Sequence, residues 1–320
     1  MKMNQSTNTI VMVRPIAFRM NEQTAVNNYY QEDIDLKSKE ISDKAQHEFD
    51  TFVQTLRNHG VEVVVVSDNT SKDTPDSIFP NNWISFHEDG TVAIYPMFAE
   101  NRRMERRSDI LDELEAKGFI IENIMDYTSA EEHGVFLEGT GSIVLDRIHK
   151  KAYCALSARA DEELFIEFCE DFEYTPVIFT AYQSVEGERL PIYHTNVMMA
   201  IADAYAIVCL DSIDDKKERK NLIKHLKESG KQIIAITEEQ VEQFAGNMLQ
   251  VKGSYDQLFL VMSSSAYHSL TDAQRAQILT FNNIIHSELG TIEACGGGSA
   301  RCMMAEVFLP KTTLSKVSSE

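Results

Sequence analysis

Five polar residues recur along the chain at almost constant spacing. They are Asn82, Glu138, His194, Asn247 and Cys302, and successive members lie 56, 56, 53 and 55 residues apart. A period of this length indicates a repeated structural unit rather than a local motif. If each unit places its residue at the same point around an axis, a thiol, an imidazole, a carboxylate and two amides meet in one site. This set of groups favours thiol chemistry.

The local sequence suggests a role for three of these residues. Cys302 follows three glycines in ACGGGSARCMM, a loop that can approach a ligand closely, and we predict that it is a nucleophile. His194, in PIYHTNVMM, can serve as both base and acid near neutral pH. Glu138, in LEGTG, can orient that imidazole or transfer protons, or it only caps the glycine-rich turn.

Length and composition exclude several classes of protein. The 320 residues are 43% hydrophobic and 25% charged, which predicts an ordinary globular core, and we expect one domain over 1–310 and a short polar tail over 311–320. The formal charge of -20 makes nucleic acid and anionic membranes poor partners. No apolar run has the length of a membrane helix and no signal peptide is evident, so we expect a cytoplasmic location.

The cysteines predict neither a disulfide framework nor a metal site. There are five, an odd number at irregular spacing, and no CxxC pair occurs. Cys154 and Cys209 lie in apolar runs and are expected in the core. Because no ligand cluster or phosphate-binding loop is evident, we expect no metal and no organic cofactor.

The elements that would position the five polar residues follow one order: strand, strand, helix, strand. In the first copy, strands at 83–87 and 91–96 precede an amphipathic helix at 101–118 and a strand at 119–124. The fifth copy is split between the two ends of the chain, which would close a ring. Later copies are expected at 142–146, 151–156, 161–172 and 175–180; at 197–202, 205–210, 214–230 and 232–237; and at 248–251, 257–262, 271–286 and 291–295.

With these motifs in place, the chain resembles the guanidine-modifying pentein superfamily, which includes arginine deiminases, dimethylarginine hydrolases and amidinotransferases. GGGSARCM resembles its nucleophile loop, LEGTG its glutamate turn and HTN its histidine turn. The resemblance implies an α/β fold, a five-bladed propeller of strand-strand-helix-strand modules. It also implies that Arg159, in ALSARAD, binds a substrate carboxylate, and that Arg103, in NRRMERR, is a further binding residue. Both arginines could instead be ordinary surface residues.

Two departures from the arginine-processing relatives bear on the substrate. Those relatives commonly carry aspartates, which pair with a guanidinium, where this chain has Asn82 in FPNNW and Asn196 in HTN. An amide can donate to a ureido oxygen and accept from a ureido NH, so the two asparagines suit citrulline better than arginine. The segment at 11–31, together with FPNNW, also resembles the citrulline-utilisation branch. We therefore expect a citrulline ureidase that yields ornithine, ammonia and carbon dioxide.

Other functions remain compatible with the sequence. An arginine dihydrolase or deiminase-like hydrolase would also use Cys302, His194 and Glu138, and an amidinotransferase would need an acceptor amine. A non-catalytic pentein binding module is the alternative from another class. The expected partner is a small ureido or guanidino amino acid, and a homo-oligomer is compatible with the sequence. We expect Asn247 to stabilise a turn and Trp83 to pack in the core.

Overall fold

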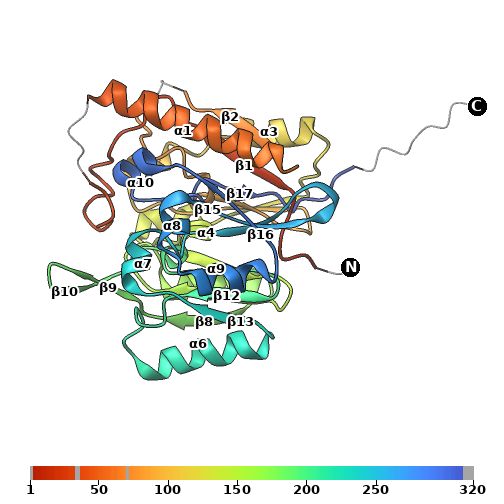
Figure 1. Ribbon diagram of the computed structural model, residues 1–320. Helices are drawn as coiled ribbons and strands as arrows, with labels where there is room; N and C mark the ends of the chain where they lie inside the picture. The colour runs from red at the N-terminus through yellow and green to blue at the C-terminus, as the bar shows by residue number, and fades with distance from the viewer. Residues whose placement is uncertain (1–2, 33–36, 70–71, 313–320) are drawn as a thin grey trace, which may run out of the picture.

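The computed structural model describes residues 3–32, 37–69 and 72–312 and shows a mixed α/β fold (Figure 1). Most of the expected tail, 313–320, lies outside the described residues. Five three-stranded sheets share one pattern, in which the central strand is antiparallel to one neighbour and parallel to the other. The sheets are β17 (Ala305–Glu306), β1 (Thr9–Arg14) and β2 (Glu62–Ser67); β3 (Ile84–Phe86), β4 (Thr91–Ile94) and β5 (Asn123–Asp126); β6 (Ile143–Asp146), β7 (Lys151–Ala155) and β8 (Thr175–Phe179); β11 (Met199–Ile201), β12 (Tyr205–Val208) and β13 (Gln232–Ala235); and β14 (Leu249–Lys252), β15 (Leu258–Ser263) and β16 (Asn283–Ser287).

The first of these sheets joins the two ends of the described chain. β17 pairs with β1 through Ile10 opposite Glu306 and Val11 opposite Ala305, so the strand after Cys302 is fixed to the N-terminal strand. A separate hairpin of β9 (Tyr182–Val185) and β10 (Glu188–Pro191) projects at one side of the molecule (Figure 1). The sheets are small, and hydrogen bonds do not join them into one continuous sheet among the described residues.

Helices connect the parallel strand pairs, because parallel neighbours need a crossover that returns the chain to the same end of the sheet. Side chains begin several of these helices: Asp161 accepts from the backbone N of Leu164 at 3.0 Å, and Asp215 accepts from Lys217 at 2.7 Å. α1 (Ser38–Asn58) and α6 (Lys216–Glu228) lie at opposite ends of the molecule (Figure 1). The α-helices are α1 (Ser38–Asn58), α2 (Glu100–Arg103), α3 (Asp109–Ala116), α4 (Gly139–Ser142), α5 (Glu162–Asp171), α6 (Lys216–Glu228), α7 (Glu238–Glu242), α8 (Ser264–Ser269), α9 (Asp272–Leu279) and α10 (Gly290–Gly296).

Several of the expected elements differ in the structure. The single helix predicted over 101–118 is two helices, α2 and α3. The helix predicted over 271–286 ends at Leu279, and the last strand of the sheet is β16, which begins at Asn283. The segment 291–295, predicted as that strand, is part of helix α10. Ile284 and Ile285 pair in parallel with Leu260 and Val261 of β15. Pairing of these β-branched residues with a buried strand outweighs the local helical pattern.

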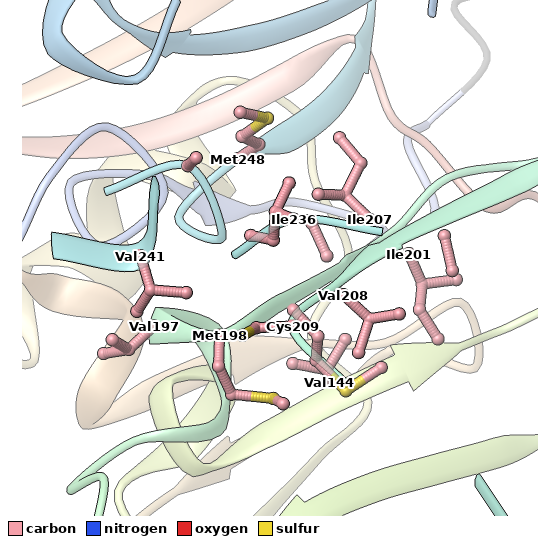
Figure 2. Close-up of a cluster of buried hydrophobic side chains, with 14 of the residues drawn as sticks. Val144, Val197, Met198, Ile201, Ile207, Val208, Cys209, Ile236, Val241 and Met248 are labelled. Carbon is pink, nitrogen blue, oxygen red and sulfur yellow. The ribbon is translucent and has the colours of Figure 1, made fainter. Parts of the chain in front are cut away.

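The largest hydrophobic cluster shows how neighbouring sheets pack. All four residues of β12 are buried on both faces, as is usual for a strand covered on each side. Figure 2 shows Ile207 and Val208 of this strand in one cluster with Val144 of β6 and Met248, which directly precedes β14. Three sheets therefore contribute side chains to one core. In the part of the chain described, no helix is long and apolar enough to cross a membrane.

Candidate active site

The structure places each of the five periodic residues shortly before the first strand of its sheet, and all five are buried. Three of them line one small cavity of about 10 Å³. Glu138 and Asn247 do not line the cavity, but they contact His194 and Cys302, which do. The cavity is lined by Asn28, Asp76, Phe79, Asn82, Arg102, Arg159, Tyr193, His194, Gly296, Gly298 and Cys302.

His194 and Glu138 form a buried pair. Nε2 of His194 lies 2.7 Å from Oε2 of Glu138, so the hydrogen on Nε2 faces the carboxylate and Nδ1 is left as the unprotonated nitrogen. Burial lowers the pKa of His194, although the carboxylate opposes that change. The imidazole is therefore neutral near pH 7 and able to accept a proton.

Glu138 stays ionised because several groups surround it. Burial alone would raise its pKa, but Arg159, the hydrogen bond to His194 and Arg102 outweigh burial and lower it. Nη1 of Arg159 lies 3.6 Å and Nη1 of Arg102 3.9 Å from Oε2. The backbone N of Phe98 donates to Oε1 at 3.0 Å. A fixed, charged carboxylate can orient the imidazole.

The thiol of Cys302 lies among amides. Nδ2 of Asn247 lies 3.2 Å and Nδ2 of Asn196 3.6 Å from Sγ. Asn196 does not line the cavity, and its Nδ2 also lies 3.3 Å from the carbonyl oxygen of Thr140. Among the described residues, no hydrogen bond joins Cys302 to His194. Catalytic hydrogen bonds are often long without substrate and tighten when it binds.

Asn82 presents a hydrogen-bond donor to the cavity. Its Oδ1 accepts from Nη1 of Arg102 at 2.8 Å, which fixes the orientation of the amide. Its buried Nδ2 has no protein partner. A Cβ atom on Gly141 would lie 2.4 Å from this Nδ2 and 2.7 Å from Nδ1 of His194. The glycine of LEGTG thus lets the Asn82 amide and the His194 imidazole share one small space.

The two arginines suggested by the family resemblance are placed differently. Arg159 lines the cavity, donates to Oδ1 of Asn27 and to the carbonyl of Thr24, and stacks 4.8 Å from the ring centroid of Tyr193. Arg103 does not line it. Instead, Nε of Arg103 donates to the carbonyl of Met97 at 3.0 Å, and its side chain is partly exposed. The neighbouring Arg102 is the arginine of this cluster that reaches the site.

Sequence reasoning missed one further charged residue, Asp76. Its Oδ2 accepts from Nδ2 of Asn21 at 2.8 Å and from Oγ1 of Thr24 at 3.1 Å, while its buried Oδ1 has no partner. Burial raises the pKa of Asp76, and the charge of Arg102 opposes that rise. Its sequence surroundings, DTPDS, are polar and gave no signal of a buried site residue. A carboxylate in this position can bind a cationic group of a ligand.

The fold and this constellation define the class of protein: the chain is a guanidine-modifying pentein. More particularly, residues 14–309 match the family described as N,N dimethylarginine dimethylhydrolase, eukaryotic, and the chain belongs to that family. No curated protein sequence matches the chain. In the part of the chain that the structure describes, no group of three or more His, Cys, Asp or Glu residues could hold a metal ion.

Solved structures share the fold at low sequence identity. ArgZ, an arginine dihydrolase from the ornithine-ammonia cycle in Cyanobacteria, is 15% identical with a TM-score of 0.72, over 95% of this chain and 41% of ArgZ. AgrE, in a complex with ornithine and NAD+, is 17% identical with a TM-score of 0.70, over 96% of this chain and 40% of AgrE. A dimethylarginine dimethylaminohydrolase adduct is 14% identical with a TM-score of 0.60, over 93% of this chain and 98% of that enzyme. The chain thus spans about two fifths of ArgZ and AgrE.

Proposed function

We propose that this protein is a citrulline ureidase with Cys302 as nucleophile. The observation that carries the proposal is the unpaired Nδ2 of Asn82 beside His194, with Oδ1 of the same amide held by Arg102. A ureido oxygen accepts hydrogen bonds, whereas a guanidinium has only N–H donors and no acceptor. A donor at this position therefore favours a ureido group over a guanidinium group.

The proposed reaction uses the buried pair as acid and base. His194 takes the proton of the Cys302 thiol, the thiolate attacks the ureido carbon, the C–N bond to the departing amine breaks, and His194 passes that proton to the leaving nitrogen. Water, deprotonated by His194, then attacks the carbamoyl thioester, and the C–S bond breaks to restore the thiol. The sum is citrulline and water giving ornithine and carbamate, which decays to ammonia and carbon dioxide. The final products, ornithine, ammonia and carbon dioxide, are the same whichever C–N bond breaks first.

The charged residues of the cavity suit the two charged groups on the α-carbon of an amino acid. Asp76 offers its unpaired Oδ1 to the α-ammonium, and Arg159 supplies a guanidinium for the α-carboxylate.

We also infer that one domain over 1–310 forms a five-bladed propeller. Direct contacts between β6 and β11, β11 and β14, and β17 and β3 support a ring of the five sheets.

The second candidate function is arginine dihydrolase, and Asp76 is the observation that favours it. An unpaired carboxylate oxygen in the cavity could bind a guanidinium as well as an ammonium group. ArgZ is described as an arginine dihydrolase and shares this fold, although likeness at 15% identity does not fix the substrate.

Separate incubation with citrulline and with arginine decides between the two functions. Ornithine and ammonia are measured in each reaction. Ornithine from citrulline without turnover of arginine supports the ureidase, and ornithine from both substrates supports the dihydrolase. Citrulline accumulating from arginine would identify a deiminase and reject both. A reaction that needs an added amine would identify an amidinotransferase.

We expect kcat/KM for citrulline to fall only at acidic pH, below the ordinary imidazole pKa of about 6.5. Burial lowers the pKa of His194, and protonation removes the base, so the rate falls as pH drops through that lowered value. The pH profile of kcat/KM tests this. Because the Glu138 carboxylate opposes the lowering, Glu138→Gln should move the acid limb to still lower pH and reduce kcat. An acid limb above the ordinary imidazole value would contradict the assignment.

A further inference from the structure

Asn247 joins two parts of the site that lie far apart in the sequence. This residue is 1% exposed and lies two residues before the start of β14. Its Oδ1 accepts from the backbone N of Arg301 at 3.0 Å and of Cys302 at 3.4 Å. These two backbone donors require an acceptor, so they fix which end of the amide faces the nucleophile loop.

With its oxygen fixed in this way, the Asn247 amide must direct its nitrogen at the sulfur. Nδ2 lies 3.2 Å from Sγ of Cys302, and the same nitrogen lies 3.2 Å from the carbonyl oxygen and 3.3 Å from Oδ1 of Asn196. Asn196 in turn places its own Nδ2 3.6 Å from Sγ. The hydrogen-bond donors around the sulfur in the described residues are thus neutral amides rather than a basic side chain.

We propose that Asn247 is a positioning residue that holds Sγ of Cys302 and stabilises its thiolate through Nδ2. The inference rests on the proposed function, in which Cys302 is the nucleophile. Hydrogen bonds to the charged form of a group favour that form, and a thiolate is a stronger acceptor than a thiol. Asparagine suits this task because one end of its amide accepts from the loop backbone and the other end donates to sulfur. This role goes beyond the turn that the sequence suggested.

The test is the pH dependence of alkylation of Cys302 by iodoacetamide, followed by mass spectrometry of the peptide that contains it. Asn247→Asp keeps an oxygen for the two backbone donors but places a carboxylate at the sulfur. We expect alkylation at pH 7 to slow by about tenfold or more, and the pH of half-maximal rate to rise, because a charged hydrogen bond is lost. Asn282→Asp is the matched control, since it puts a carboxylate at another buried amide, one that bonds Tyr205 and Gln250 outside the cavity.

The outcomes separate this inference from the proposed function. If wild-type Cys302 reacts at neutral pH and Asn247→Asp leaves the pH profile unchanged, the inference is overturned and the nucleophile stands. If wild-type Cys302 is no more reactive near neutral pH than a free thiol, both are overturned. Thermal unfolding reports whether each variant is folded. Should Asn247→Asp fail to fold, Asn247→Ser, too short to reach both the loop backbone and Sγ, must shift the profile in the same direction.

Discussion

Replacement of Cys302 by serine is expected to reduce kcat for citrulline by about 10⁴-fold or more. The hydroxyl has nearly the shape of the thiol, and Sγ sits in a buried pocket that needs no repacking for the change. A serine hydroxyl, however, ionises far less readily than a thiol, and the amides of Asn196 and Asn247 cannot compensate for that difference. Release of ornithine from citrulline measures the loss.

Cys154→Ser is the matched control for this substitution. Cys154 is also fully buried, but it lies in β7 and contacts the carbonyl of Ala155 rather than the cavity. It should retain kcat within about tenfold, with any loss appearing as reduced thermal stability, because a buried hydroxyl costs about 1–3 kcal/mol when poorly paired. Activity of Cys302→Ser within tenfold of wild type, in folded protein, would rule out a covalent role for the thiol.

The residues that face the cavity could be predicted only where their type and spacing carried a signal. Cys302, His194 and Glu138 are chemically distinctive and precede the first strands of their sheets, and the structure brings them into one site. Asp76 and Arg102 carried no such signal. An aspartate in a loop and one arginine of four in a cluster look like surface residues until tertiary packing buries them.

The position of Asn196 shows a second limit of sequence reasoning. Its neutrality could be noted from HTN, but its sequence neighbours do not say whether the amide faces substrate or sulfur. The structure places it against Cys302 and outside the cavity, so Asn82 alone of the two asparagines lines it. The same holds for β16, where pairing with β15, a contact between segments about 24 residues apart, overrides the helical pattern of 271–286. Contacts of this kind depend on the fold as a whole.

Selection between ureido and guanidino substrates is therefore expected to rest on Asn82, and Asn82→Asp tests it. The aspartate keeps the oxygen that accepts from Arg102 at 2.8 Å and replaces the unpaired Nδ2 by a carboxylate oxygen. That oxygen repels a ureido oxygen and attracts a guanidinium. Each change is worth roughly 1.5–3 kcal/mol. The ratio of kcat/KM for arginine to that for citrulline should rise by about 10²- to 10⁴-fold.

Asn81→Asp is the control for this substitution: it shows whether the position of the new charge matters or only its presence near the site. Asn81 is equally buried and adjacent in sequence, but its Nδ2 lies 3.3 Å from Oγ1 of Thr140 and its side chain does not line the cavity. A carboxylate there adds the same net charge one residue away without facing the substrate, so the substrate ratio should change by less than about tenfold. If Asn81→Asp and Asn82→Asp alter the ratio equally, the overall potential of the cavity selects the substrate. If neither substitution alters the ratio, Asn82 does not determine the choice of substrate, and the charge of Asp76 is the next one to remove.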